Sequence, residues 1–382
     1  MQKQFLIAPG PTPVPEEARL AMARELMHHR GPVFKRLFGE VRKQLQWLFE
    51  TQEEVLTLTC SGTGAFEAAI INFTRREDTL IAIGGGKFGE RWGKIAGAYG
   101  MKVVTLDIPW GQTAKPEALR DLLAAHPECA MVTLSASETS TGTYHPVEEL
   151  AAVVRAHGRA LFAVDGITAV GVHRLPMDAW GIDVLVSGSQ KAFGIPPGLG
   201  FVAANARAWE RYESSNHPKY YFDLGRERTN HVQNQTAFTP AISLVVALHE
   251  VMKLMQTEGL EALIERHRLN ACAAQAGVQA LGCRLYPEVA SYSTTAAVVP
   301  EGVDAQQVVR AMRDRYGVTI AGGQDHLASS VFRIGHIGFI DRSDMLIAIS
   351  ALEFALRDAG AKIEIGAGLR AVQNVYAQPV GQ

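Results

Sequence analysis

The sequence has few cysteines, no long hydrophobic run and almost no excess of charge. Its four cysteines are widely spaced and form no C-x-x-C pair, so we expect reduced thiols in a cytoplasmic protein. No apolar run approaches the ~20 residues that span a bilayer. The short apolar run FLIA near the start is too short for the core of a signal peptide, so we expect no such peptide.

The charge balance and the histidine spacing exclude further partners. The chain has 37 Lys and Arg against 39 Asp and Glu, a net charge of −2, and the basic residues form no stripe. We therefore expect neither nucleic acid nor a membrane as a partner. The H-E-x-x-H motif is absent too, because Lys253 stands where the second histidine would follow His249-Glu250. We expect no metal site.

What the sequence does contain is a regular alternation of apolar runs and helical stretches between residues 55 and 205. The runs are VLTLTC (55–60), TLIAIG (79–84), KVVTLD (102–107), AMVTLSA (130–136), ALFAVDG (160–166), DVLVSG (183–188) and GFVAA (200–204). Continuous apolar strands separated by helices predict an α/β fold with a mostly parallel sheet that helices cover on both faces.

The segments on either side of this pattern predict two further parts. Four prolines between positions 9 and 15 disfavour a helix or a central strand, so we expect residues 1–20 to form an extended arm, although helical spacing begins near residue 16. Long helices follow at 241–280, and shorter mixed patterns continue from 283. With 382 residues, the chain is long enough for two domains. We predict a large α/β domain over 21–257 and a small C-terminal α+β domain over 258–382.

A lysine follows one of the predicted strands directly. In parallel sheets, ligands bind outside the carboxyl ends of the strands, and Lys191 lies just after DVLVSG, beside the glycine- and proline-rich stretch AFGIPPGLGF. A dry site lowers the pKa of an ammonium group, and a neutral amine forms a Schiff base with an aldehyde cofactor. The alternative is a solvated loop lysine.

An aspartate ends another strand. Asp165 closes the run ALFAVD, where it would be poorly solvated without a cation. A protonated pyridine nitrogen is one such cation, and the pair would keep that nitrogen charged. The alternative is an aspartate that caps a helix or a turn.

The turn after VLTLTC predicts an anion site. Ser61-Gly62-Thr63 combines small residues and hydroxyl groups at the start of a predicted helix. The free N–H groups and the positive end of a helix suit a phosphate. The alternative is an ordinary strand-to-helix turn.

The stretch GGGKFG fits two different cofactors. Gly84, Gly86 and Gly89 match G-x-G-x-x-G, and Asp107 ends the next run, where a dinucleotide-binding fold places its ribose-binding acid. Alternatively, the glycines let the chain approach a flat ring on which Phe88 stacks. A dinucleotide fingerprint belongs to the first strand of its fold, whereas VLTLTC and its turn come earlier. The ordered set of phosphate turn, aromatic, acid and lysine favours pyridoxal phosphate.

Motifs along almost the whole chain carry a family resemblance. They are APGPTPVP, CSGTGAFEAA, ETSTG, AVDGITAVG, SGSQKAFGIPPGLGF and FRIGHIG. The sequence resembles the class V aminotransferases, a branch of the fold-type I pyridoxal-phosphate enzymes, and within them the alanine–glyoxylate and serine–pyruvate aminotransferase group. The resemblance implies a fold-type I architecture with a large cofactor-binding domain and a smaller C-terminal domain.

The resemblance also implies roles for the residues around the cofactor. Lys191 would form the internal aldimine and then move the proton of the substrate α-carbon, while Asp165 would pair with the pyridinium. Phe88 and Ile167 would cover the two ring faces, although many members have a larger aromatic side chain than Phe88. The phosphate contacts match Ser61, Gly62, Thr63 and Gln190.

Other positions match contacts to the substrate or to a second subunit. Thr139 matches the hydrogen-bond partner of the phenolic oxygen, and Arg333 matches the arginine that binds the substrate carboxylate; without the family, Arg333 would be interpreted as a surface arginine. Either Thr236 or Thr239 matches a phosphate contact from the partner subunit. Gly10 matches the border of the substrate pocket, where His28-His29-Arg30 is a further candidate.

We therefore predict a homodimeric pyridoxal-phosphate aminotransferase that moves an amino group from alanine or serine to glyoxylate or pyruvate. Another donor, such as 2-aminoethylphosphonate or pyridoxamine, is one alternative. Cysteine desulfuration is a second, although the AGGQDH loop (321–326) contains no cysteine. More distant alternatives are an NAD-dependent oxidoreductase and a non-catalytic subunit.

Overall fold

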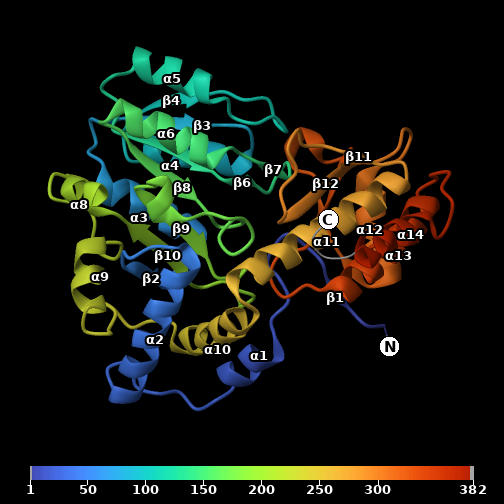
Figure 1. The fold of residues 1–382 in the computed structure, drawn as a ribbon, viewed down its shortest axis with the longest axis horizontal. Helices are drawn as coiled ribbons and strands as arrows, with labels where there is room; N and C mark the ends of the chain where they lie inside the picture. Colours follow the sequence, from blue (N-terminus) through green and yellow to red (C-terminus); the bar gives the residue numbers. More distant parts are fainter. Residues whose placement is uncertain (1, 379–382) are drawn as a thin grey trace.

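A seven-stranded sheet forms the centre of the larger part of the molecule (Figure 1). The structure is a computed structural model that describes residues 2–378. The sheet order is β2-β10-β9-β8-β5-β3-β4. Its strands are β2 (Val55–Leu58), β3 (Thr79–Ile83), β4 (Lys102–Leu106), β5 (Met131–Ser135), β8 (Leu161–Asp165), β9 (Val184–Gly188) and β10 (Gly200–Ala204). Only β10 runs antiparallel to its neighbours within this sheet, so the predicted mostly parallel sheet is confirmed.

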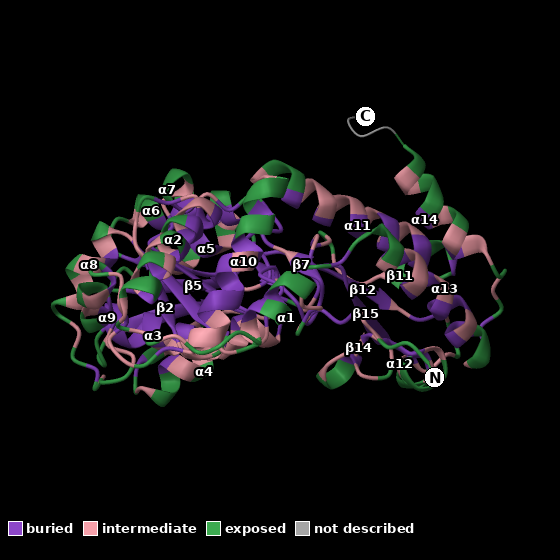
Figure 2. Cartoon of the chain, turned by 90° about the horizontal axis from the view of Figure 1, so that it is seen from below, coloured by how far each residue is buried: buried purple, intermediate pink, exposed green. Residues whose placement is uncertain are grey.

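Hydrophobic side chains pack against both faces of this sheet. In β3, Leu80 and Ala82 join a core with Phe66 of α3, whereas Ile81 and Ile83 join a separate core with Phe34 of α2. Because successive residues of a strand point to opposite faces, a strand buried on both sides needs a continuous apolar run. Figure 2 shows the buried strands between partly exposed helices.

The helices of this part pack around the sheet. They are α2 (Pro32–Phe49), α3 (Gly62–Phe73), α4 (Lys87–Ala98), α5 (Pro116–Ala125), α6 (Val147–His157), α7 (Met177–Trp180), α8 (Ala206–Tyr212), α9 (Leu224–His231) and α10 (Ile242–Glu258). A short hairpin of β6 (Ser137–Glu138) and β7 (Thr143–Tyr144) follows β5.

A second, antiparallel sheet lies in the C-terminal part of the chain. Its order is β11-β12-β15-β14, and its own hydrophobic core includes Phe332 and Ile349. The elements are α11 (Leu260–Ala280), β11 (Arg284–Leu285), β12 (Thr294–Val298), α12 (Ala305–Tyr316), β13 (Val318–Thr319), β14 (Ala321–Gly322), η1 (Asp325–Leu327), β15 (Val331–Gly335), α13 (Arg342–Asp358) and α14 (Ala367–Ala377). We propose that the predicted boundary near 258 corresponds to Gly259, between α10 and α11.

The prediction of an extended arm over residues 1–20 is wrong in its second half. Strand β1 (Phe5–Leu6) pairs with β13, but helix α1 (Glu16–Met22) starts directly after Pro15. Proline is tolerated where a helix begins because its missing N–H would have no intrahelical partner there. Glu16 and Glu17 in the first turn favour the positive end of the helix.

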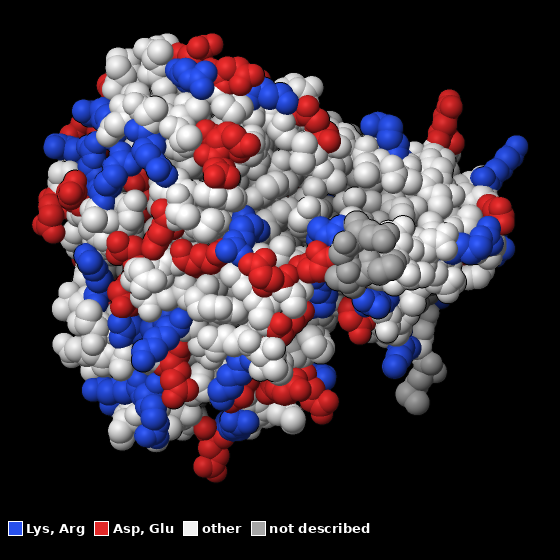
Figure 3. Space-filling model, in the orientation of Figure 1, with Lys and Arg blue, Asp and Glu red and all other residues white. Residues whose placement is uncertain are grey.

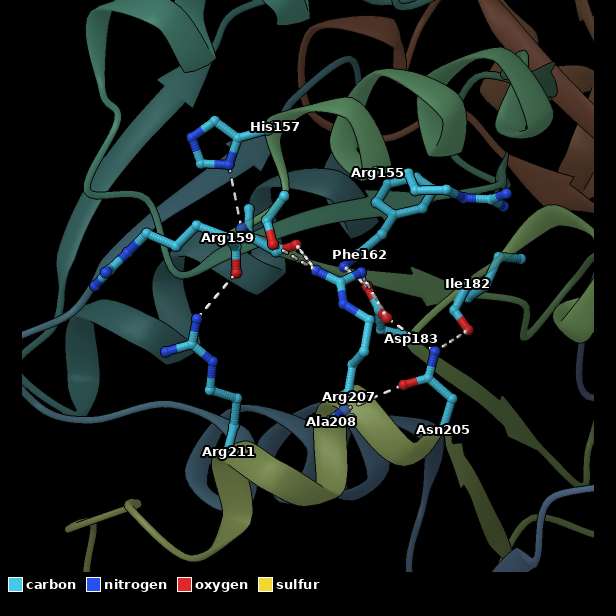
Figure 4. Close-up of polar contacts among 12 residues, drawn as sticks. Arg155, His157, Arg159, Phe162, Ile182, Asp183, Asn205, Arg207, Ala208 and Arg211 are labelled. Atoms are coloured by element: carbon cyan, nitrogen blue, oxygen red, sulfur yellow. Dashed lines mark hydrogen bonds and ion pairs between the residues drawn. The ribbon is translucent and has the colours of Figure 1, made fainter.

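A buried aspartate ties together the amino-terminal ends of two central strands. Figure 4 shows Asp183, just before β9, accepting hydrogen bonds from the Phe162 N–H (2.8 Å), the Asn205 amide (2.8 Å) and Arg207 Nη1 (3.0 Å). Arg207 also donates to the carbonyl of Ala160 at 3.1 Å. This cluster fixes β8 and β9, whose opposite ends lead to Asp165 and Lys191.

The surface of the molecule carries charges of both signs. Basic and acidic side chains are interspersed over the face drawn in Figure 3. Within residues 2–378, no helix has the length and apolar composition needed to cross a membrane.

Candidate active site

The predicted site residues of the large sheet lie where its strands end. Asp165 is the last residue of β8, and Lys191 follows β9. Ser61 to Thr63 connect β2 to α3, and Phe88 lies in the first turn of α4 after β3. Because β2, β3, β8 and β9 all point the same way, these groups lie along one edge of the sheet.

Lys191 lies beneath the N-terminal arm. Its Nζ donates a hydrogen bond to the carbonyl oxygen of Pro9 at 2.9 Å. Burial, with a smaller contribution from the charge of Arg333, lowers the pKa of Lys191 to about 8. Gly10 has a φ of +138°, and a Cβ placed there would be 2.3 Å from Lys191 Nζ. Gly10 is therefore required to leave room for the amine, and the interpretation of Lys191 as a solvated loop residue does not hold.

Asp165 is buried with its carboxylate held from two sides. Oδ2 accepts a hydrogen bond from Ser135 Oγ at 2.8 Å, and Oδ1 accepts one from the Ile167 N–H at 2.7 Å. Burial raises the pKa of Asp165 to about 7, against a lowering influence from the charge of Lys191. A cation bound beside this carboxylate would restore its charged form. A pyridinium nitrogen fits that requirement.

The turn before α3 offers free donors. Ser61 precedes the helix in an extended conformation and makes no side-chain cap, so the first N–H groups of α3 have no acceptor within the helix. A Cβ built at Gly188 would lie 3.3 Å from Gln190 Oε1 and 3.5 Å from the Gly62 nitrogen, so Gly188 brings these groups together. Gln190 Oε1 is buried and has no hydrogen-bond partner among the described residues. The free N–H groups of this turn fit a phosphate, to which Gln190 would turn its NH₂ group, because its amide oxygen can only accept.

Ile167 packs directly over the same turn. A Cβ built at Gly62 would be 2.3 Å from Ile167 Cδ1, so a side chain at this position would displace Ile167. The segment after Asp165-Gly166 therefore contacts the start of α3, and the aspartate and the proposed anion subsite are neighbours.

The glycines before Phe88 serve a protein carboxylate. Glu138 Oε2 accepts hydrogen bonds from the N–H groups of Phe88 (3.0 Å) and Gly89 (2.9 Å). A Cβ at Gly86 would lie 2.3 Å from Glu138 Cδ. The helix end that a dinucleotide pyrophosphate would use is therefore occupied by Glu138, which the sequence analysis missed.

Arg333 and Thr139 are brought together across the two sheets. Arg333, in β15, is buried; its Nη1 donates to the Thr139 carbonyl at 3.0 Å and its Nε to the Gly322 carbonyl at 2.9 Å. Burial lowers the pKa of Arg333 to about 10. The interpretation as a surface arginine is thus wrong. The Thr139 hydroxyl contacts the Thr168 hydroxyl at 3.1 Å.

The two threonines that were predicted to reach a second subunit lie apart from Lys191. Both border a groove beside the end of β2. Thr236 is buried and donates its hydroxyl to the Phe238 carbonyl at 2.6 Å, whereas Thr239 is exposed. His28 and His29 stack on each other in the loop between α1 and α2, and the neighbouring Arg30 bonds Gln235.

Arg91 is a second residue that the sequence analysis missed. It lies on α4, its guanidinium is 4.7 Å from the centroid of the Phe88 ring, and its Nη1 donates to Thr63 Oγ1 at 3.2 Å. The only signal for it in the sequence is its position one helical turn after Phe88.

The thiols take no part in this arrangement. All four cysteines are free, and burial raises the pKa of Cys60 and Cys283 to about 12, which leaves these thiols unreactive at neutral pH. Within residues 2–378, no three His, Cys, Asp or Glu side chains come together as a group that could hold a metal ion.

Comparison with known proteins gives a single family. A sequence profile described as "Aminotransferase class-V" matches residues 6–343. An L-aspartate–glyoxylate aminotransferase of Paracoccus denitrificans is 34% identical, covering 98% of this chain and 96% of that protein. A serine–glyoxylate aminotransferase of Methylorubrum extorquens is 31% identical, covering 97% and 96%. A protein of Synechococcus sp. named soluble hydrogenase, small subunit, is 42% identical, covering 98% and 99%.

Solved structures agree with this family in fold. The pyridoxamine–pyruvate aminotransferase of Mesorhizobium loti superposes with a TM-score of 0.93 at 28% identity, covering 98% of this chain and 97% of that one. An alanine–glyoxylate aminotransferase of Nostoc sp. has a TM-score of 0.88 at 31% identity, covering 94% and 96%. The predicted fold class is thereby confirmed.

Proposed function

This chain belongs to the class-V aminotransferases, and on that premise we propose that it transfers an amino group from alanine or serine to glyoxylate or pyruvate. It is a pyridoxal-phosphate-dependent transaminase. The observation that carries the proposal is the placement of Lys191 after β9 and of the buried Asp165 at the end of β8, on one edge of the sheet.

The residues present fit the cofactor. Asp165 would pair with the ring nitrogen, Phe88 and Ile167 would cover its faces, and Thr139 would bond its phenolic oxygen. When bound, pyridoxal phosphate supplies a reactive aldehyde and a ring that accepts the electron pair of the broken Cα–H bond. The donors proposed for its phosphate are the turn residues Ser61, Gly62 and Thr63 together with Gln190.

Lys191 has two tasks in this proposal. Its neutral form would be the one that reacts with the aldehyde of a bound cofactor, and the lowered pKa increases the neutral fraction near pH 8. Once the substrate amine had replaced the lysine on the cofactor, Lys191 Nζ would hold the proton that leaves the substrate α-carbon. It would then deliver this proton to the cofactor. The Pro9 carbonyl, which accepts the Nζ hydrogen bond, orients the amine meanwhile.

Arg333 is the proposed binding residue for the substrate carboxylate. Its Nε and Nη1 are fixed by the Gly322 and Thr139 carbonyls, so the guanidinium is held in one orientation before substrate binds. A planar guanidinium suits a carboxylate. Gly10 lies next to Lys191 and would border the same pocket, which favours a small donor.

We further propose a homodimer in which Thr239 completes the phosphate site of the neighbouring subunit. Thr236 already donates its hydroxyl to Phe238, whereas Thr239 is exposed. This contrast favours Thr239 of the two candidates. The Thr239→Val variant should bind the cofactor more weakly, whereas Thr236→Val should chiefly lower stability.

One cyanobacterial relative is named as a hydrogenase subunit, but residues 2–378 contain no cluster of side chains that could hold a metal ion. The four cysteines are free, and burial raises the pKa of two of them, Cys60 and Cys283. The groups near the sheet edge are instead an amine, a carboxylate and a guanidinium. The residues therefore support transamination.

A spectral screen with labelling tests the proposal. Borohydride reduction of the protein with its cofactor, followed by peptide mapping, should label Lys191. Each candidate donor (alanine, serine, aspartate, 2-aminoethylphosphonate, pyridoxamine, cysteine) is then mixed with the protein, and conversion of the cofactor to its amine form is followed by absorbance. Absence of label at Lys191, or no conversion with alanine or serine, would overturn the assignment or its substrate class, respectively.

A further inference from the structure

Arg91 is a cation of the site region that has no carboxylate partner. It lies on α4 one turn after Phe88 and is partly buried. Within residues 2–378, no Asp or Glu lies at ion-pair distance from it, whereas Glu90 next to it pairs with Lys94 at 3.1 Å. An arginine in this setting has charge and donors available for a ligand.

The contacts of Arg91 point toward the anion subsite. Its guanidinium extends over the Phe88 ring and reaches Thr63 in the first turn of α3. Its positive charge also helps to lower the pKa of Lys191, although burial and the charge of Arg333 contribute more. The guanidinium thus lies within electrostatic reach of both ends of the proposed cofactor site.

The direction of the hydrogen bond to Thr63 decides what that hydroxyl can do. Arginine has only donors, so Thr63 Oγ1 is the acceptor of the 3.2 Å bond from Arg91 Nη1. The proton of the Thr63 hydroxyl is then left to donate elsewhere. The same helical turn begins with N–H groups that have no acceptor within the helix and no side-chain cap.

We propose that Arg91 is a positioning residue of the phosphate subsite, which orients the Thr63 hydroxyl toward the cofactor phosphate and adds positive charge beside the start of α3. The inference rests on the proposed function, because the phosphate is that of pyridoxal phosphate. It adds a cation from the same subunit to a subsite that otherwise consists of neutral donors.

The test compares two ligands that differ only in the phosphate. Pyridoxal phosphate and pyridoxal are titrated into cofactor-free wild-type protein and into Arg91→Gln, with Lys94→Gln as a control that removes a charge from the same helix. We expect Arg91→Gln to bind pyridoxal phosphate about 10- to 100-fold more weakly, the range for one charged hydrogen bond. Its affinity for pyridoxal should fall far less, by no more than the lost contact with Phe88 and the raised pKa of Lys191 account for, and Lys94→Gln should match the wild type for both.

A conservative variant and inorganic phosphate complete the design. Arg91→Lys should recover part of the lost affinity, since it keeps the charge but loses the second donor. Inorganic phosphate should compete with pyridoxal phosphate less well in Arg91→Gln than in the wild type. Circular dichroism and thermal melting establish that each variant is folded.

The possible failures are distinct. Equal losses for pyridoxal and pyridoxal phosphate in Arg91→Gln would show that Arg91 only supports the Phe88 ring, and this would overturn the inference. Unchanged affinity for both would do the same. If wild-type protein formed no borohydride-reducible adduct at Lys191, the proposed function itself would fail before Arg91 was tested.

Discussion

Removing the carboxylate of Glu138 should both destabilise the protein and displace Phe88, the proposed ring-stacking residue. In the folded chain Glu138 is fully buried and accepts hydrogen bonds from the N–H groups of Phe88, Gly89 and Ser140. A buried donor left without an acceptor costs about 1–3 kcal/mol. Because water entering the vacated space satisfies part of this demand, we expect Glu138→Ala to lower the free energy of unfolding by about 3–5 kcal/mol.

The isosteric variant separates charge from volume. Glu138→Gln keeps the size of the side chain and one acceptor oxygen, but its NH₂ group faces backbone donors. We expect a loss of about 1–3 kcal/mol. Since the Phe88 backbone depends on Glu138, both variants should also bind the cofactor up to about tenfold more weakly, the amount that one stacked aromatic contributes.

The assay is urea denaturation of the cofactor-free protein, followed by titration with pyridoxal phosphate. Glu148→Gln is the matched control, because Glu148 is an exposed acid in the first turn of another helix and should cost less than about 1 kcal/mol. If the free energies of unfolding of Glu138→Ala and Glu148→Gln differed by less than about 1 kcal/mol, the claim that Glu138 holds the start of α4 would be refuted.

Three further predictions concern the amine, its neighbour and the distant strand ends. The rate at which cofactor-free protein captures pyridoxal phosphate on Lys191 should rise with pH around a midpoint of about 8, since only the neutral amine attacks; a midpoint near about 10.4, the value of a free lysine, would contradict the burial argument. Gly10→Ala should reduce borohydride labelling of Lys191, because the added Cβ would lie 2.3 Å from Nζ and displace the amine, and because a φ of +138° strains any residue with a side chain; normal labelling would refute the close approach. Asp183→Ala should lower the urea-derived free energy of unfolding by about 2–6 kcal/mol, because the Phe162 N–H and the Asn205 amide lose a buried acceptor, without changing the cofactor spectrum of the folded protein; a changed spectrum would show that this cluster takes part in the site.

Much of the large sheet could be predicted from the sequence because its strands are buried on both faces. In the run TLIAI, alternate side chains enter two different hydrophobic cores. Leu80 faces one core and Ile81 faces the other. The one polar residue of this run, Thr79, is β-branched and therefore typical of a strand. The helical spacing from residue 16 marks the start of α1, but the predicted arm extends to residue 20 and so overlaps this helix. Proline breaks a helix in its interior and is tolerated at its beginning, where Pro15 stands.

Lys191 and Asp165 could be located from the sequence because topology alone decides their neighbourhood. Parallel strands bring their carboxyl ends to one edge, and a polar residue at the end of an apolar run must therefore face that edge. The burial of Arg333 could not be derived in this way. It depends on the packing of the small sheet against the Thr139 segment, which are 194 residues apart in the chain.

The two glycine turns illustrate what local patterns leave open. The turn at Ser61–Thr63 and the turn at Gly84–Gly89 both lead from a buried strand into a helix, and both suit an anion by their residues alone. The contact that distinguishes them comes from elsewhere in the chain, because Glu138 bonds the start of α4 from 50 residues away. At the start of α3, by contrast, Ser61 makes no side-chain cap and Arg91 contacts Thr63. One helix start is thus closed by a protein carboxylate and the other is left open beside a cation. A cofactor with a single phosphate group needs one open turn of this kind, and for this reason the arrangement favours pyridoxal phosphate over a dinucleotide.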